Sequence, residues 1–219
     1  KRMAPFARSL PKIRQRVLID INAHGVTKRR VIASLLWIMD RAKPLRIGNE
    51  KYSRENKTFG LCTLESRHVR TTGSKVTIRF IGKKHIENHV SFTHPKIAQL
   101  FRSLKRSSSR PFIPVSCQDV NDYLKAFHPD ITAKDFRTFH ANRIFLQSLS
   151  ASTLPSTKTE TRKILSTAYK QTAEHLNNTP TVAKSDYINP IYIQAYQKNP
   201  KPFHSLSTRS IPSFITRKN

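Results

Sequence analysis

Five residues, far apart in the chain, have side chains that could carry out chemistry on a phosphate. Tyr187 has a phenol that could act as a nucleophile, and it lies on a short segment between two prolines. A guanidinium is a planar fork of N–H donors that matches two phosphate oxygens, and an amide or ammonium can donate further hydrogen bonds. These supporting groups belong to Arg46, Arg137, Lys83 and Asn178. If Tyr187 is not a nucleophile, the chain is simply a very basic, mostly helical protein.

The composition indicates a polyanionic partner. The 219 residues contain 40 Lys and Arg against 13 Asp and Glu, which gives a net charge of +27. No acidic residue precedes Asp20 and none follows Asp186, so both ends of the chain are purely basic. Solubility does not require such an excess, because a balanced mixture of charges is sufficient. We therefore expect nucleic acid as the partner.

The sequence offers no site for a cofactor. The two cysteines, Cys62 and Cys117, are far apart and lack zinc-ligand spacing. Gly82-Lys83-Lys84 does not fit the GxxxxGK[ST] frame of a nucleotide-binding loop. The most apolar run, Val31 to Met39, is shorter than the ~20 residues that a membrane span requires. We therefore expect no cofactor, no metal, no ATP and no membrane partner.

Residues from about 67 to 93 change from helical to alternating periodicity. Apolar residues alternate from Val76 to Phe80 and again from Ile86 to Phe92. Gly73 and the Gly82-Lys83 pair mark the turns, so the pattern predicts a three-stranded antiparallel meander. Lys83 would lie at the second hairpin tip, where a long cation can reach into a groove. Taken alone, a lysine there is more simply a solvated turn residue.

The rest of the chain is predicted to be helical, which makes the fold α+β and mostly α-helical. Residues 1–9 have no regular pattern. A first helix is predicted from Leu10 and should end at His24-Gly25. A second helix should be capped by Thr27 and stopped by Pro44. Further helices are predicted from Pro95, after a Ser116–Asp119 capping box, and from about Thr159 to Leu176, with polar linkers at 105–110 and 150–159.

Both arginines are predicted to lie at helix ends. Arg46 comes just past the second helix and is followed by Gly48, which gives a fixed but accessible position. Arg137 falls in the first turn of a helix that begins with a Thr132–Asp135 capping box. Free N–H groups and the positive end of the dipole favour a phosphate there. Alone, Arg46 reads as a solvated loop residue, and Arg137 is explained equally well by structure or by function.

The C-terminal third contains the tyrosine. Its long helix stops before Asn178-Thr179-Pro180, and Tyr187 lies on the short segment that follows. A short helix is predicted for Ile191 to Gln197. Residues 198–219 carry three prolines and no strong periodicity, so we expect a basic tail, either packed on the rest of the chain or not.

Four separated motifs occur along the chain. They are Arg46-Ile47-Gly48-Asn49-Glu50-Lys51-Tyr52 with Glu55-Asn56 and Gly60-Leu61-Cys62-Thr63-Leu64, then Phe80-Ile81-Gly82-Lys83, then Lys134-Asp135-Phe136-Arg137-Thr138-Phe139, and finally Asn178-Thr179-Pro180 with Tyr187. In this order they resemble the first arginine motif, the hairpin lysine, the second arginine motif and the final box of type IB DNA topoisomerases. The likeness extends from about residue 20 to about residue 197, and it is greatest to compact bacterial and large-virus members.

The resemblance implies a fold and a setting. The fold would be the catalytic fold shared by tyrosine recombinases and type IB topoisomerases, over residues 1–197, with residues 198–219 as the tail. The partner would be double-stranded DNA, bound by a monomer inside a bacterial cell or a viral particle. Compact members have a small β-rich N-terminal domain, and no such domain precedes the helices here. The sequence therefore looks like a catalytic domain alone.

The resemblance also implies a mechanism. Tyr187 would attack a DNA phosphorus, form a 3′-phosphotyrosyl link and free a 5′-hydroxyl, so that supercoils relax before the strand is resealed without ATP. The non-bridging oxygens would be held by Arg46, Arg137 and Asn178. Lys83 would be the general acid for the 5′-oxygen, with Lys134 as a candidate relay. The DNA-binding residues would be Lys51, Tyr52 and Lys134.

Asn178 departs from one branch of the family. Many members carry a histidine at this place, while others, chiefly bacterial, carry asparagine. An asparagine amide can still donate a neutral hydrogen bond to a phosphate oxygen, but it cannot act as an acid or a cation.

Two other functions fit parts of the sequence. Tyrosine site-specific recombinases use the same Arg-Lys-Arg-Tyr chemistry but usually carry a histidine close to the second arginine. Here Asp135 stands two residues before Arg137, and Thr138 follows it directly, which argues against a recombinase. The second alternative is a basic nucleic-acid-binding domain without catalysis, for which Tyr187 would be dispensable.

Overall fold

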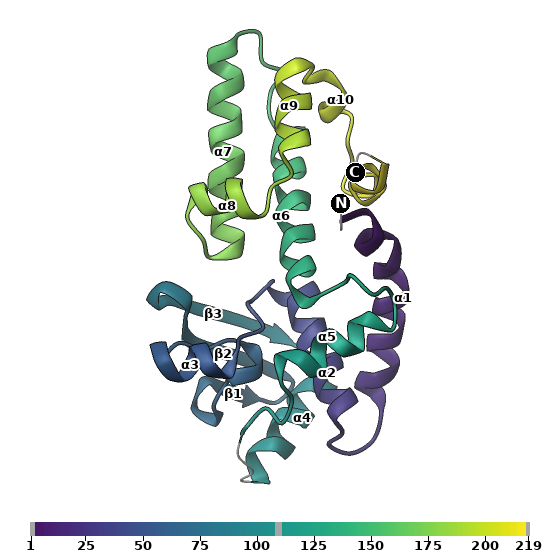
Figure 1. The fold of residues 1–219 in the computed structure, drawn as a ribbon, viewed down its shortest axis with the longest axis vertical. Coiled ribbons are helices and arrows are strands. Elements are labelled where there is room, and N and C mark those ends of the chain that lie inside the picture. Colours follow the sequence, from purple (N-terminus) through teal and green to yellow (C-terminus); the bar gives the residue numbers. More distant parts are fainter. Residues whose placement is uncertain (1–2, 108–110, 218–219) are drawn as a thin grey trace. The chain divides into compact units, whose positions relative to one another are not determined.

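The computed structural model describes residues 3–107 and 111–217. It divides into two compact units. One contains Ser9 to Lys134, and the other contains residues up to Arg8 together with those from Asp135 onward. Within the described residues the fold is mostly helical with one three-stranded antiparallel sheet, as predicted (Figure 1). No helix in these ranges is long and apolar enough to cross a membrane.

The first helix, α1 (Met3–Asn22), begins earlier than predicted. Residues 1–9 were expected to be irregular, but Phe6 is fully buried and continues the apolar face of the helix toward the N-terminus. Its ring lies 4.9 Å from Phe136 and 5.6 Å from Phe139 between centroids. Burial among aromatic rings therefore outweighs the basic character of this segment.

Helix α2 (Lys28–Trp37) begins and ends near the predicted residues. Thr27 caps it by accepting a hydrogen bond from the Arg30 N–H at 3.2 Å. A π-helical turn, η1 (Ile38–Ala42), follows and ends before Pro44. A short helix, α3 (Glu50–Asn56), lies where the sequence predicted no helix or strand.

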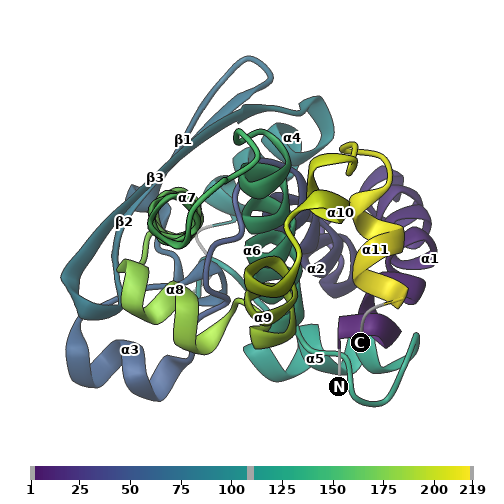
Figure 2. The same ribbon diagram turned by 90° about the horizontal axis from the view of Figure 1, so that it is seen from above.

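The sheet consists of β1 (Val69–Thr72), β2 (Lys75–Gly82) and β3 (Ile86–Thr93), with β2 between the other two strands. Figure 2 shows the three strands from above. Ile78 on β2 pairs with Val69 on one side and Val90 on the other, which confirms the predicted meander. Helix α4 (Pro95–Arg106) contacts β1 and β2. Helix α5 (Cys117–Lys125) has the predicted capping box, with Ser116 and Asp119 bonded reciprocally at 3.1 and 2.8 Å.

The other unit is entirely helical over its described residues. It contains α6 (Ala133–Ser150, from Asp135 onward), α7 (Lys158–Leu176), α8 (Pro180–Asp186), α9 (Pro190–Lys198), α10 (Lys201–His204) and α11 (Ile211–Arg217). Figure 1 shows α8 folded back against the end of α7.

The chain from Lys201 to Arg217 is folded into two short helices. Phe203, Ile211 and Ile215 are buried, and the rings of Phe203 and Phe214 lie 5.5 Å apart. Pro202 and Pro212 each occupy the second position of a short helix, where a missing N–H costs nothing. The prolines that suggested a tail therefore begin α10 and α11.

Candidate active site

Tyr187 closes the last turn of α8. Helix α7 ends at Asn177, which adopts a left-handed conformation with φ +50°, and Asn178 N–H returns to the Ala173 carbonyl at 2.8 Å. Thr179 then caps α8, and Pro180 is the first residue of the helix. Tyr187 is the C-cap residue, and its N–H bonds to the Ala183 carbonyl. The tight turn at Asn177 thus sets where α8 and its terminal tyrosine lie.

The Tyr187 ring is part of the core of its unit. Only 5% of the residue is exposed, and it clusters with Ala141 of α6 and Leu176 of α7. The half-buried Val182 of α8 packs against the same cluster. Three helices therefore restrict the movement of the ring, which favours a fixed direction for the phenol.

Arg137 lies directly beside this phenol. Its Nε donates a hydrogen bond to the Tyr187 hydroxyl at 3.4 Å, and its guanidinium carbon is 5.2 Å from the centre of the ring. A second nitrogen, Nη2, donates to the Leu176 carbonyl at 3.0 Å. The guanidinium is thereby held against both the phenol and the end of α7.

The position of Arg137 on its helix differs from the prediction. Helix α6 begins at Ala133, so Arg137 is its fifth residue and lies beyond the first turn. Its own N–H is used within the helix there, and the effect of the helix dipole has faded. Arg137 is only 4% exposed. Any anion binding at this point would depend on the guanidinium and not on the helix terminus.

Asn178 is half-buried and belongs to the same unit as Arg137 and Tyr187. It begins the link from α7 to α8, two residues after Leu176, whose carbonyl receives the Arg137 hydrogen bond. The structure therefore brings Arg137 and Tyr187 into contact and places Asn178 on the link between α7 and α8, the helix that ends at Tyr187.

Arg46 belongs to the other unit, where its backbone is fixed tightly. The carbonyls of Arg46 and Ile47 accept hydrogen bonds from Leu61 and Cys62 at 3.0 and 2.7 Å. Gly48, with φ +87°, touches Gly60 so closely that a Cβ on Gly60 would lie 2.5 Å from the Gly48 backbone. The Arg46 side chain is half-buried.

The three predicted site lysines of this unit are exposed. Lys83 begins a short 3-10 turn, Lys83–His85, at the tip between β2 and β3, as the hairpin prediction requires. Lys51 lies on α3, and Lys134 lies at the start of α6. The side chain of Tyr52, the remaining predicted DNA contact, lies outside the described residues.

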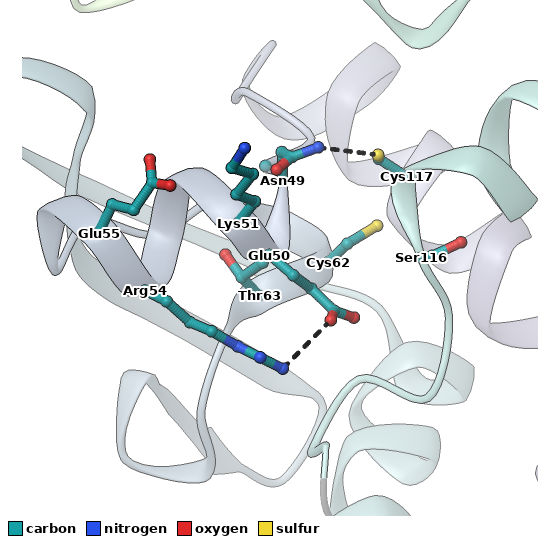
Figure 3. A pocket seen from close by; sticks show the side chains of 10 residues that line it. Asn49, Glu50, Lys51, Arg54, Glu55, Cys62, Thr63, Ser116 and Cys117 are labelled. Atoms are coloured by element: carbon teal, nitrogen blue, oxygen red, sulfur yellow. Dashed lines mark hydrogen bonds and ion pairs between the residues drawn. The ribbon is translucent and has the colours of Figure 1, made fainter.

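A cavity of about 610 Å³ adjoins the Arg46 segment (Figure 3). Its lining includes Asn49, whose amide lies 4.0 Å from the Cys117 sulfur, and Glu50, which pairs with Arg54 at 3.6 Å. Burial raises the pKa of the Cys62 thiol, which also lines the cavity. In the described ranges no three His, Cys, Asp or Glu side chains cluster so as to hold a metal ion.

Comparison with known proteins settles the family. Residues 1–206 match the family described as "Eukaryotic DNA topoisomerase I, catalytic core". The chain belongs to the type IB DNA topoisomerase catalytic-core family. The resemblance carried by the four sequence motifs is thereby confirmed.

Viral and plant members of the family are similar to the chain. The DNA topoisomerase 1B of Acanthamoeba polyphaga mimivirus is 32% identical over 221 aligned positions, which cover 93% of this chain and 66% of that protein. The DNA topoisomerase I of monkeypox virus is 31% identical over 71% of this chain and 50% of its own length. The DNA topoisomerase 1 of Daucus carota is 32% identical over 73% of this chain and 21% of its own length. The chain thus spans about two thirds or less of these topoisomerases.

One residue in contact with the Tyr187 segment was not predicted. Asn142 is 1% exposed, and its side chain bonds to the backbone at Tyr187 and Asn189. A signal was present in the sequence, because Asn142 falls midway between Phe139 and Phe145 on the apolar stripe of its helix. A polar residue on a buried stripe must find hydrogen-bond partners.

Proposed function

We propose that the chain is the catalytic core of an enzyme that relaxes supercoiled DNA by cutting and resealing one strand. The observation that carries the proposal is the hydrogen bond from Arg137 to the Tyr187 hydroxyl, in a chain of the type IB topoisomerase family. A tyrosine held beside a guanidinium is suited to attack a phosphate, because the same cation can stabilise the phenol oxygen and the phosphate oxygens.

Tyr187 is the proposed nucleophile. Its phenol would release its proton to water, and the oxygen would form a bond to phosphorus while the bond from phosphorus to the 5′-oxygen breaks. The product is a 3′-phosphotyrosyl link with a free 5′-hydroxyl, and the phosphoester bond is conserved in that link. Resealing is the reverse of the same reaction, so it needs neither ATP nor a metal.

The supporting residues would act on the charges that develop in the transition state. Arg46 and Arg137 would bind the non-bridging oxygens, and Asn178 would add a neutral hydrogen bond. Lys83, on its exposed hairpin tip, would protonate the departing 5′-oxygen, with Lys134 as a candidate relay. An alkoxide is a poor leaving group without this proton.

Double-stranded DNA is the proposed partner, bound by a monomer inside the cell or viral particle that holds it. The net charge of +27 supports this choice, as do the exposed Lys51 and Lys134. Together with Tyr52, these residues would contact the backbone of the duplex. Because phosphate contacts release counterions, the affinity for DNA should fall steeply as salt concentration rises.

The direct test is relaxation of a plasmid by this chain in EDTA, without ATP. The plasmids should carry no recombination site. We expect them to relax whether they are positively or negatively supercoiled. Stopping the reaction with detergent should trap protein covalently attached to a 3′ DNA end. A protein that binds DNA but neither relaxes plasmid nor forms this adduct would be the non-catalytic binder instead.

Gly60→Ala should slow cleavage of DNA by displacing Arg46. The new Cβ would lie 2.5 Å from the Gly48 backbone and 2.8 Å from the Arg46 carbonyl, so the Arg46 segment must shift. We expect stability to fall by about 1–3 kcal/mol, as for other overpacked sites. Misplacing Arg46 should slow adduct formation on the order of 10- to 100-fold.

Gly73→Asn is the matched control for that substitution. Gly73 has a positive φ, +55°, and nothing lies within 4 Å of the position of its Cβ. Asparagine tolerates this backbone conformation, so adduct formation measured by single-turnover kinetics should be unchanged. Equal rates for Gly60→Ala and Gly73→Asn would contradict the role given to the Arg46 segment.

A further inference from the structure

The side chain of Asn142 makes three hydrogen bonds in the core of the unit that contains the residues from Asp135 onward. Its Nδ2 donates to the Thr138 carbonyl at 2.7 Å, one turn back in α6, and to the Tyr187 carbonyl at 2.8 Å. Its Oδ1 accepts from the Asn189 N–H at 2.8 Å. All three distances are good hydrogen-bond lengths, and Asn142 is 1% exposed. Both N–H groups of the amide and its oxygen are thus hydrogen-bonded in a place without solvent.

The two bonds to the tyrosine segment have a particular geometry. A side-chain amide offers the same N–H and C=O groups as a peptide bond, and here it pairs with the carbonyl of Tyr187 and the N–H of Asn189. It therefore binds the backbone on both sides of Ile188, as a neighbouring strand would. This segment is the joint between α8, which ends at Asp186, and α9, which begins at Pro190.

Other contacts also hold this joint in place. Ile188 is 2% exposed, and its N–H bonds to the Ala183 carbonyl at 3.0 Å. The Asn189 side chain caps α9 by accepting from the Ile191 N–H at 3.0 Å. These contacts fix the joint to its own two helices, whereas Asn142 ties it to α6.

Helix α6 also carries Arg137, which bonds to the hydroxyl of the same tyrosine. One helix therefore holds both ends of Tyr187: Asn142 binds its backbone, and Arg137 binds its phenol. A continuous helix keeps a constant separation between residues five apart. The position of the phenol oxygen relative to the guanidinium is consequently set in the frame of α6.

We infer that Asn142 is a positioning residue for the Tyr187 nucleophile. The inference rests on the proposed function, because it assigns to Asn142 the task of holding the attacking oxygen in line for the reaction. Asn142 touches neither DNA nor the reacting atoms in this role. A merely structural amide would stabilise the fold equally well, so the two roles must be separated by kinetics.

The test compares the parent chain with Asn142→Ala in single-turnover cleavage of a DNA duplex. The duplex is designed so that the strand released by cleavage dissociates and cannot be religated. We expect the rate constant of adduct formation to fall about 10²-fold, the effect typical of displacing a reacting group by roughly 1 Å. The final yield of adduct and the affinity for DNA should be kept. Religation, measured on preformed adduct, should slow by the same factor, since cleavage and religation share one transition state.

Leu149→Ala supplies the control for loss of stability. Leu149 lies on the same helix and is fully buried, and its aliphatic side chain cannot form a hydrogen bond with the tyrosine segment. It should lower the melting temperature at least as much as Asn142→Ala. Any effect on cleavage should be a smaller yield from a partly unfolded population, with the rate constant unchanged.

If Asn142→Ala does not fold, a second variant can be used for the same test. Asn142→Asp preserves the shape and the acceptor for the Asn189 N–H but cannot donate to the Tyr187 carbonyl when ionised. Its rate constant should also fall in both directions. A parent-like rate constant in whichever of the two variants folds would overturn the inference and leave the proposed function standing. A parent chain that forms no adduct would overturn both.

Discussion

Replacing Tyr187 by phenylalanine should abolish covalent adduct formation and plasmid relaxation while DNA binding survives. The substitution removes only the hydroxyl, which is the proposed attacking atom. Loss of a covalent nucleophile typically costs on the order of 10⁴-fold or more, so no adduct should be detectable. Detergent trapping on end-labelled DNA measures the adduct, and a filter-binding titration measures affinity.

The structure explains why this variant should fold. The ring keeps its contacts with Ala141 and Leu176, and the substitution removes the 3.4 Å hydrogen bond from Arg137. A single hydrogen bond of this kind contributes about 1 kcal/mol. Tyr169→Phe is a matched control in the same unit, because its ring stacks on Phe145 at 5.6 Å and should stay there. If Tyr187→Phe still relaxed plasmid, Tyr187 would not be the nucleophile.

Local patterns determined much of what could be predicted. The meander follows from apolar alternation, since Val76, Ile78 and Phe80 all point to the buried face of β2. The caps at Thr27 and Ser116 follow from the need of free helix N–H groups for side-chain acceptors. Both signals depend on residues close in sequence, and this is why they could be found without a structure.

Other features depend on contacts between distant residues, and these the sequence did not reveal. The start of α1 depends on Phe6 meeting Phe136 and Phe139. The burial of Arg137 depends on Leu176 and Tyr187, which lie far along the chain. Motif order predicted that Arg137 and Tyr187 act together, but no periodicity could give the contact between them or the part played by Asn142.

Lys83→Ala and Arg137→Ala should respond in opposite ways to a sulfur atom at the 5′-bridging position of the DNA. With ordinary DNA both should be slow. Loss of general acid catalysis costs roughly 10²- to 10⁴-fold, and loss of one electrostatic donor to the transition state costs about 10²- to 10³-fold. Adduct formation in single-turnover reactions measures both, and the parent chain on each substrate is the reference.

The sulfur separates the two roles because a thiol is a far stronger acid than an alcohol, so the 5′-thiolate leaves without a proton. Lys83→Ala should therefore approach the parent rate on this substrate. Arg137→Ala should stay slow, because the non-bridging oxygens still need their guanidinium whatever the leaving atom. Arg137 also supports the phenol at 3.4 Å and the Leu176 carbonyl at 3.0 Å, and a leaving thiolate restores neither contact. Equal defects of both variants on both substrates would remove Lys83 from the role of general acid and leave it, with Lys51 and Lys134, among the proposed DNA contacts.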